Sequence, residues 1–208
     1  TLGGPIFSVN SKQLMGHPKF FQQFCDSIIT FEGEEPLHRL LTTLKNGSTL
    51  RGVPNLIFCE DGKIKSNEER VELRFEEMPP PTFDGLPMDL YLSPYPILPV
   101  LQSRGCYWGK CTFCTHSFIY GHRYGKQRTE QMVNELESLA ETYKTKYFTF
   151  SDEAVSPHSL NDVSEEIIKR DVKIKSLALL KFEKVMDQKL FEKMKQAGFI
   201  FLMYGLES

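Results

Sequence analysis

The feature that most constrains the fold is a regular alternation of strand-like and helix-like segments over residues 99–208. Four short apolar segments have the length and composition of strands: 100–103, 147–150, 174–180 and 200–204. Between them, apolar residues recur at helical spacing in three segments, which begin near Thr129, Ser156 and Asp187. Strand–helix repeats of this length form right-handed βαβ units, so we expect an α/β fold with a parallel sheet or barrel.

Residues with known end preferences mark the ends of these helices. We expect Thr129, Ser156 and Asp187 to cap the helices through their side-chain oxygens. Pro157 suits the first turn of the second helix, and Gly198 is expected to end the third. The apolar segment 200–204 follows directly, which predicts a fourth, buried strand.

Prolines divide the chain. Seven of the twelve prolines lie between Met78 and Val100. Proline fixes φ and lacks an N–H group, so this stretch cannot be a regular helix or a central strand. We therefore predict a first domain over residues 1–77, a linker over 78–98 and a second domain over 99–208.

The first domain has its own pattern of short elements. Residues 27–30 are expected to form a strand, and a helix with Pro36 in its first turn should follow and end at Asn46-Gly47. The helix carries leucines at helical spacing: Leu37, Leu40, Leu41 and Leu44. Asp61-Gly62 lies between two strand-like segments and predicts a β-hairpin.

Composition is that of an ordinary globular protein. Hydrophobic residues make up 40% and the net charge is -2, so charge gives no reason to expect a nucleic-acid partner. No apolar run approaches the roughly 18 residues that a membrane span needs, so we expect no membrane span, and no secretory leader opens the chain, so nothing argues for secretion. The chain starts at Thr1 without Met, with residues 1–5 like the tail of a strand and its turn, and an apolar segment ends just before Ser208. We therefore interpret the chain as a fragment cut at both ends.

One segment of the chain is basic and rich in cysteine, although the net charge of the whole chain is close to zero. No acidic residue lies between Leu90 and Thr129, and three of the five cysteines lie there together with His116 and His122. The bases in this segment are Arg104, Lys110, Arg123, Lys126 and Arg128. Such positive charge would help to stabilise thiolates and an anionic ligand.

Cys106, Cys111 and Cys114 form the motif with the strongest chemical implication. Four residues separate the first pair and two separate the second, on a loop that contains Gly105 and Gly109. Thiolates at these separations can converge on zinc or on an iron–sulfur cluster. Structural sites normally have four protein ligands, whereas a catalytic metal centre keeps one position open, so three thiolates favour a catalytic centre.

The strand, the cysteine loop with Phe113 before its last cysteine, and the βα units that follow resemble the radical S-adenosylmethionine (SAM) superfamily. The resemblance covers residues 97–208. It implies that the three cysteines hold three irons of a [4Fe-4S] cluster and that SAM chelates the fourth. The first spacing is one residue longer than the Cys-x3-Cys-x2-Cys typical of that superfamily, and Gly109 could absorb the extra residue.

The first domain resembles the end of a cobalamin-binding domain, which some radical SAM enzymes carry directly before the barrel. The resemblance rests on Leu2-Gly3-Gly4-Pro5, the loop at Gly33, the Asp61-Gly62 turn and the proline-rich linker. It implies that Gly3, Gly4 and Gly33 let the nucleotide tail of cobalamin approach the backbone. The expected fold is therefore the C-terminal part of a Rossmann-like cobalamin-binding domain, followed by a partial (βα) radical SAM barrel.

The resemblance also implies roles in SAM binding for residues at the ends of the predicted strands. Phe113 would lie beside the adenine, and Lys181 would pair with the SAM carboxylate. The SAM amino group would be bound after the second strand, and Glu207, next to Ser208, would reach the ribose or the amino-acid part. The candidates for the amino group are Ser151, Asp152 and Glu153. No residue is assigned a direct catalytic role.

The function that this implies is reductive cleavage of SAM to a 5′-deoxyadenosyl radical. With cobalamin, methyl transfer to an unactivated carbon is the leading outcome, and cyclisation or rearrangement is the second. The expected partners are a small-molecule substrate and an electron donor such as flavodoxin or ferredoxin. An exposed cluster is sensitive to oxygen, so the resemblance also implies a cytoplasmic setting. Two alternatives stay open: a radical SAM methylthiotransferase, and a non-enzymatic interaction domain stabilised by zinc, with His116 or His122 as the fourth ligand.

Overall fold

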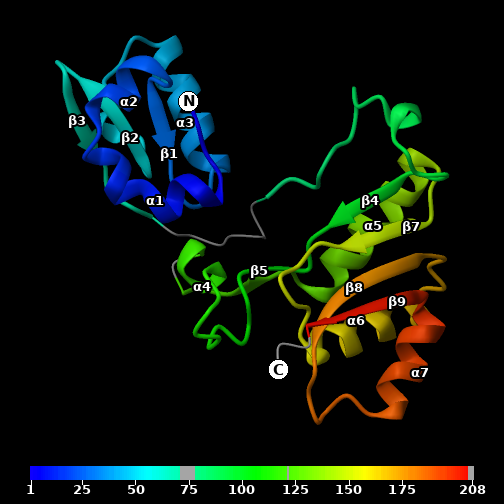
Figure 1. Cartoon of the computed structure of the whole chain (residues 1–208). Helices are drawn as coiled ribbons and strands as arrows, with labels where there is room; N and C mark the ends of the chain where they lie inside the picture. Colours follow the sequence, from blue (N-terminus) through cyan, green and yellow to red (C-terminus); the bar gives the residue numbers. More distant parts are fainter. Residues whose placement is uncertain (71–77, 121, 206–208) are drawn as a thin grey trace. The chain divides into compact units, whose positions relative to one another are not determined.

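The computed structural model describes residues 1–70, 78–120 and 122–205. It divides into two compact units (Figure 1). Unit 1 comprises Thr1–Leu73 and Gly109–Arg123, and unit 2 comprises Arg74–Trp108 and Tyr124–Ser208. The division passes through the cysteine loop. In the described ranges, no helix is both long and apolar enough to span a membrane.

Unit 1 contains a small sheet and several helices. Its three strands, β1 (Ser27–Ile29), β2 (Leu56–Glu60) and β3 (Lys63–Ser66), pair antiparallel in the order β1-β2-β3. The helices are α1 (Pro5–Met15), α2 (Pro18–Gln23), α3 (Glu34–Lys45), α4 (His116–Ile119) and the 3-10 turn η1 (Leu50–Gly52). Asp61 and Gly62 both have positive φ, 52° and 72°, which confirms the predicted hairpin.

Helix α3 has the predicted leucine spacing but buries little of it. Leu40 is 2% exposed and packs with Ile29 and Phe58, whereas Leu37, Leu41 and Leu44 are 45%, 59% and 59% exposed. The periodicity thus predicted the helix correctly, and one leucine of the four lies in the core.

Unit 2 is built on a four-stranded parallel sheet (Figure 1). Its strands are β4 (Ile97–Val100), β7 (Tyr147–Phe150), β8 (Lys175–Lys181) and β9 (Phe199–Gly205), in the order β4-β7-β8-β9. The crossover helices are α5 (Thr129–Tyr143), α6 (Pro157–Lys169) and α7 (Gln188–Ala197). Three smaller elements are η3 (Met88–Leu90), β5 (Ser103–Arg104) and β6 (Gly125–Lys126), the last two being paired antiparallel. The strand–helix alternation predicted from sequence is confirmed.

The core of unit 2 lies between this sheet and its crossover helices. Alternate strand residues such as Leu98, Phe148 and Ala178 are at most 1% exposed and pack with Met132 and Leu160 of the helices. This is the pattern expected when one face of a sheet is covered by amphipathic helices.

Two of the three predicted helix caps are present in the structure. Ser156 accepts a hydrogen bond from the N–H of Ser159 (3.2 Å), and Asp187 accepts one from that of Leu190 (2.9 Å), so both caps are confirmed. Thr129 is the first residue of α5 rather than its cap, which is Arg128 with no side-chain hydrogen bond.

The first strand of unit 2 lies at Ile97–Val100 and not at 100–103. It contains Pro99, which is tolerated because β4 is at the edge of the sheet. Strand β9 is also at an edge, and Ile200, Phe201 and Met203 are 63%, 54% and 49% exposed. The expectation of a buried fourth strand was therefore wrong, because one side of β9 has no neighbouring strand among the described residues.

Part of the proline-rich segment packs on helix α5. The Phe83 ring contacts that of Tyr143 edge to face, with 5.5 Å between centroids. The Tyr143 hydroxyl accepts a hydrogen bond from the N–H of Phe83 (2.7 Å) and donates one to the Asp84 carboxylate (2.9 Å). This part of the predicted linker is thus attached to unit 2.

Candidate functional site

The candidate site of unit 2 lies at the carboxyl edge of the parallel sheet. Because the four strands run in one direction, the segments that follow them leave the sheet at the same edge. The cysteine loop follows β4, residues 151–153 follow β7, and Lys181 ends β8. Glu207 follows β9 and lies outside the described residues, so its predicted role in SAM binding is not addressed by the structure.

Asp152 fastens the base of the cysteine loop. Its side chain is 3% exposed, and one carboxylate oxygen accepts a hydrogen bond from the N–H of Gln102 (3.0 Å). The other oxygen accepts one from the Ser103 hydroxyl. Both oxygens therefore bind the protein itself, and this geometry suits a positioning role better than direct contact with SAM. Ser151 is exposed and Glu153 is half-buried on either side of it.

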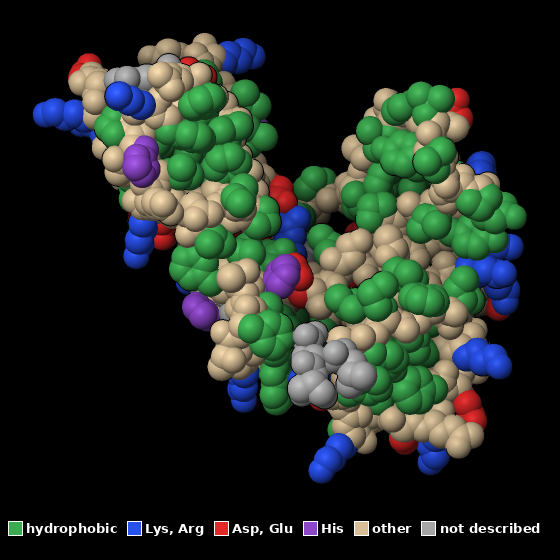
Figure 2. Space-filling view, viewed as in Figure 1, with side chains coloured by type: hydrophobic (Ala, Val, Ile, Leu, Met, Phe, Trp, Pro, Cys, Tyr) green, Lys and Arg blue, Asp and Glu red, His purple; other side chains and the backbone are tan. Residues whose placement is uncertain are grey.

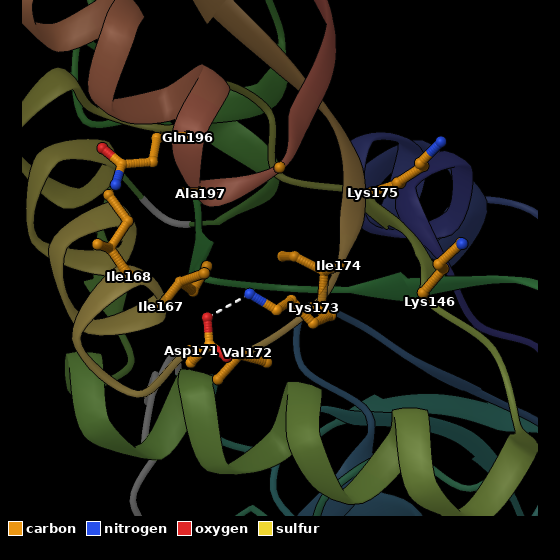
Figure 3. Close-up of a pocket in the computed structure, with 11 residues that line it drawn as sticks. Lys146, Ile167, Ile168, Asp171, Val172, Lys173, Ile174, Lys175, Gln196 and Ala197 are labelled. Atoms are coloured by element: carbon orange, nitrogen blue, oxygen red, sulfur yellow. Dashed lines mark hydrogen bonds and ion pairs between the residues drawn. The ribbon is translucent and has the colours of Figure 1, made fainter.

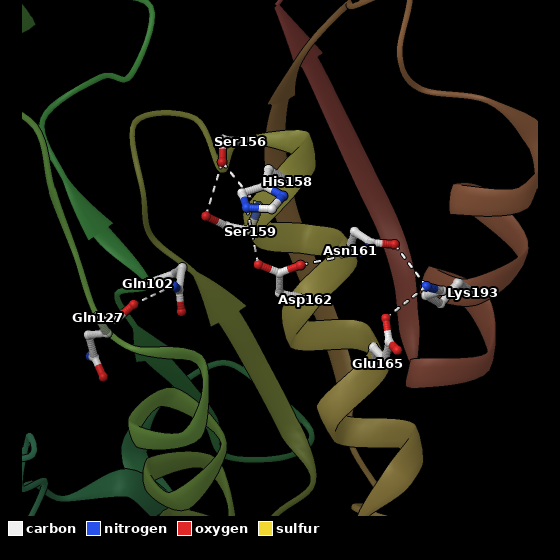
Figure 4. Close-up of polar contacts among 9 residues, drawn as sticks. All are labelled: Gln102, Gln127, Ser156, His158, Ser159, Asn161, Asp162, Glu165 and Lys193. Carbon is white, nitrogen blue, oxygen red and sulfur yellow. Dashed lines mark hydrogen bonds and ion pairs between the residues drawn. The ribbon is translucent and has the colours of Figure 1, made fainter.

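A second set of hydrogen bonds joins the two ends of the loop (Figure 4). The Gln102 side chain donates to the carbonyl of Gln127 (3.0 Å), whose N–H donates to the Gln102 carbonyl (2.8 Å). The Gln127 side chain donates to the carbonyl of Leu101 (2.8 Å) and to the Glu135 carboxylate (3.1 Å). These bonds close the loop at its base. Figure 4 also shows the capping Ser156 and, on α6 and α7, the contacts of Lys193 with Asn161 and Glu165.

The buried Asp152 predicts a pH dependence of stability. Burial raises the pKa of Asp152 from 3.8 to about 6, against the opposing effect of its hydrogen bonds. The folded state therefore holds this proton more tightly than the unfolded state. We expect the free energy of unfolding to fall by about 3 kcal/mol from this group as the pH rises from about 3 to about 7.

The measurement is urea unfolding of the wild type and Asp152→Asn across this pH range. An asparagine can accept from the N–H of Gln102 and donate to the Ser103 oxygen, and it carries no titrating group. The stability of wild type relative to Asp152→Asn should decrease as the pH rises. Parallel pH profiles for the two proteins would show that Asp152 does not titrate in this range.

Two aromatic residues of the cysteine loop contact the end of β8 and the segment after it. The Tyr107 hydroxyl donates a hydrogen bond to the Glu183 carboxylate, and the Lys181 ammonium lies 3.9 Å from the centroid of the Trp108 ring. Burial raises the pKa of Tyr107, and the hydrogen bond to Glu183 raises it further. Sequence reasoning assigned Lys181 to the SAM carboxylate and did not select Tyr107, Trp108 or Glu183.

The three cysteines of the motif are free thiols. Cys111 is exposed, Cys106 and Cys114 are half-buried, and the N–H of Cys114 donates to the Cys111 carbonyl (3.2 Å). Gly105 and Gly109 have positive φ of 78° and 59°, so glycine at these two positions permits a backbone that other residues adopt rarely.

The donor set of these thiols fits an iron–sulfur cluster in its chemistry, since thiolates are the usual ligands of such clusters. Over residues 1–70, 78–120 and 122–205, no group of three or more Cys, His, Asp or Glu side chains is arranged to hold a metal ion. Among these residues, neither the three cysteines proposed for the cluster nor the cysteines with His116 or His122, the zinc alternative, are arranged around a common metal position. Metal ligands are commonly brought together by the metal itself, because binding is coupled to folding.

The remaining predicted residues lie in unit 1. Phe113 is 68% exposed, which leaves its ring accessible to a ligand. Leu2 forms a parallel bridge to Ile28 of β1, so Gly3-Gly4 and Gly33 follow two parallel segments and each precedes a helix. Gly4 has a φ of 99° and needs glycine for that reason, whereas a side chain at Gly33 would meet nothing within 4 Å. This arrangement is compatible with a ligand at the helix starts.

A pocket of about 350 Å³ lies at the opposite, amino edge of the sheet in unit 2 (Figure 3). It is lined by residues that precede β7, β8 and β9, including Lys146, Ile174 and Gly198. Asp171 and Lys173 form an ion pair in its wall. Since ligands of parallel α/β folds bind at the carboxyl edge, this pocket is not part of the candidate site.

Comparisons with known proteins identify the class of fold. No family model matches the chain. Among solved structures, the radical SAM methyltransferase TsrM from Kitasatospora setae matches 99% of this chain and 41% of its own, with a TM-score of 0.76 and 19% identity. The cobalamin-dependent SAM radical enzyme OxsB matches 99% of this chain and 30% of its own, with a TM-score of 0.73 and 22% identity. The fold is that of cobalamin-dependent radical SAM enzymes, which confirms the resemblance found in the sequence.

One curated relative is similar in sequence. An uncharacterized methyltransferase from Pyrococcus horikoshii is 29% identical over 187 residues, which are 88% of this chain and 40% of that protein. The chain thus spans less than half the length of this relative and of both solved structures.

Proposed function

We propose that this chain is part of a cobalamin-dependent radical SAM methyltransferase. The observation that carries the proposal is a loop with three free thiols that leaves the first strand of a parallel sheet at the edge where residues 151–153 and Lys181 also lie. The fold shared with TsrM and OxsB and the methyltransferase relative support it.

Within this proposal, Cys106, Cys111 and Cys114 are the ligands of a [4Fe-4S] cluster. When bound, the cluster with SAM would supply the 5′-deoxyadenosyl radical, and cobalamin would supply a methyl carrier. The chain's own residues bind and orient these groups. Phe113 offers its exposed ring to the adenine, and Ser151 and Glu153 offer oxygen acceptors to the SAM amino group.

The proposed cobalamin site lies in unit 1, at Gly3, Gly4 and Gly33. These glycines follow the parallel pair formed by Leu2 and β1, and they directly precede the starts of helices α1 and α3. The residue before each helix, Gly4 for α1 and Gly33 for α3, makes no side-chain capping hydrogen bond. A phosphate of the nucleotide tail suits such a position.

The open face of the sheet in unit 2 is suited to an apolar substrate. Pro99, Thr149, Leu177 and Phe201 lie in one row across the four strands, on the face opposite the helices. Phe201 and Met203 are half exposed on β9, and hydrophobic side chains gather over this part of unit 2 (Figure 2). We propose that a small-molecule substrate lies against this face, because an apolar wall excludes water from a reactive radical.

The electron donor is proposed to be a flavodoxin or a ferredoxin, and the setting cytoplasmic. Both follow from the proposed cluster, which must be reduced and kept from oxygen, and neither rests on a contact in the structure.

The test uses the full-length protein, reconstituted with iron and sulfide without oxygen and then incubated with hydroxocobalamin. We expect the absorption of bound cobalamin after gel filtration. With dithionite and SAM carrying a deuterated methyl group, we expect 5′-deoxyadenosine or a methylated cobalamin. A protein that retains no cobalamin and converts no SAM would contradict the proposal. Retention of cobalamin with production of 5′-deoxyadenosine alone would favour cyclisation or rearrangement over methyl transfer.

A further inference from the structure

The segment that follows β8 is fixed in place by an aromatic stack. The Phe182 ring lies parallel to that of Tyr204 on β9, with 4.3 Å between centroids and 17° between the ring planes. Tyr204 belongs to the partly buried residues that pack on the core of unit 2. The residues on either side of Phe182 are Lys181 and Glu183, which are therefore held on a segment with a rigid base.

Both of these charged residues contact the cysteine loop. Lys181 places its ammonium 3.9 Å from the Trp108 ring centroid, and the same ammonium donates a hydrogen bond to the carbonyl of Phe182 (3.5 Å). Glu183 accepts the hydrogen bond from the Tyr107 hydroxyl. A cation over an indole ring and a phenol on a carboxylate are both directional contacts, so together they define an orientation for two successive residues.

Tyr107 and Trp108 occupy a special place in the motif. They follow Cys106 directly and lie within the four-residue gap before Cys111. This gap is one residue longer than the one typical of the radical SAM superfamily, which the motif resembles. They are also the last residues of unit 2 before the chain passes into unit 1 at Gly109. The Tyr107 ring additionally contacts that of Tyr124, where the chain returns to unit 2, with 6.3 Å between centroids.

We propose that Lys181 and Glu183 are positioning residues that hold the backbone after Cys106, and so fix the direction in which this thiol enters the cluster. This rests on the proposed function, in which Cys106 is a cluster ligand. The longer spacing gives the loop one more freely rotating residue, and the two contacts remove that freedom at Tyr107 and Trp108. Lys181 then acts on the site through Trp108 and not through the SAM carboxylate.

The first experiment measures the reactivity of the thiols in the full-length, metal-free protein. Wild type and variants are treated with iodoacetamide, and mass spectrometry follows the labelling of Cys106, Cys111 and Cys114 separately. The variants are Glu183→Ala and Lys181→Met. Each is expected to raise the labelling rate of Cys106 by about fivefold, the factor that corresponds to losing one contact of this class, and to leave Cys111 and Cys114 unchanged.

Conservative variants and a neighbouring lysine provide the controls. Glu183→Gln keeps an acceptor for the Tyr107 hydroxyl and Lys181→Arg keeps a cation over Trp108, so both should restore the wild-type rate. Lys184→Met changes an exposed lysine one residue further on and should have no effect. An unchanged Cys106 rate in Glu183→Ala and Lys181→Met overturns the proposal. Equal acceleration at all three cysteines, with a lower midpoint of thermal unfolding, also overturns it.

A second measurement separates this proposal from the proposed function. After reconstitution, iron content and the EPR spectrum of the reduced protein are compared with and without SAM. If the wild type takes up a cluster, Glu183→Ala should show an altered spectrum or less iron, and Glu183→Gln should match the wild type. An unaltered Glu183→Ala spectrum with full iron overturns the positioning role. If the wild type takes up no cluster while Cys106 labelling still responds to Glu183→Ala, the contacts order the loop and the proposed function fails.

Discussion

Replacement of Cys106 by alanine in the full-length protein is expected to remove most of the iron that reconstitution introduces. The iron content should fall from about four irons per chain to well below one. Cys106, Cys111 and Cys114 are free thiols on one loop, and a three-ligand cluster has no protein ligand to spare. Alanine in place of Cys111 or Cys114 should have the same effect. The measurement is iron and sulfide per chain after removal of unbound metal.

The matched controls are the other two cysteines and the two histidines next to the loop. Cys25 and Cys59 are free, half-buried thiols of unit 1, and burial raises the pKa of Cys25, which keeps it protonated. Their alanine variants should retain full iron. His116→Ala and His122→Ala should also retain it. Loss of one bound zinc from a histidine variant, with no iron in the wild type, would instead identify a structural zinc site.

Replacement of Gly198 by alanine is expected to destabilise unit 2 by about 3 kcal/mol or more. Gly198 ends helix α7 with a φ of 100°, a conformation that residues with a side chain rarely adopt. A Cβ atom there would lie 2.2 Å from the carbonyl oxygen of Ile174, which belongs to the backbone leading into β8 and cannot rotate away. The backbone strain and the steric overlap therefore both lower the stability of the variant. Urea unfolding followed by circular dichroism measures the loss.

Gly52→Ala is the control for this substitution. A Cβ at Gly52 would have nothing within 4 Å, and its φ is not positive, so stability should change little. A Gly198→Ala protein as stable as the Gly52→Ala protein would mean that the turn after α7 is built differently from the structure described above.

Sequence was informative where a signal is local. The caps at Ser156 and Asp187 and the end of α7 at Gly198 each depend on a few neighbouring residues, and the structure has all three. The hairpin at Asp61-Gly62 is of the same kind. Such signals depend on the backbone geometry of a single turn, so they can be recognised without knowledge of the tertiary structure.

Sequence was less informative where the outcome depends on distant neighbours. An apolar composition suggested that β9 is buried, but it lies at the edge of the sheet, which composition does not reveal. Asp152 was selected because it follows a strand, yet its hydrogen bonds go to Gln102 and Ser103, about fifty residues earlier in the chain. The contacts of Tyr107 with Glu183 and of Trp108 with Lys181 join residues that are more than seventy positions apart in the chain. The only available hint was the position of two aromatic residues beside a cysteine.

The central claim is that Cys106, Cys111 and Cys114 hold a cluster with one iron open to SAM. It is tested most directly by EPR of the reduced, reconstituted full-length protein, recorded with and without SAM, together with iron, sulfide and zinc counts. We expect about four irons per chain and an EPR signal that SAM alters. About one zinc per chain, with no signal that responds to SAM, would contradict it and leave the cysteine loop as a structural element.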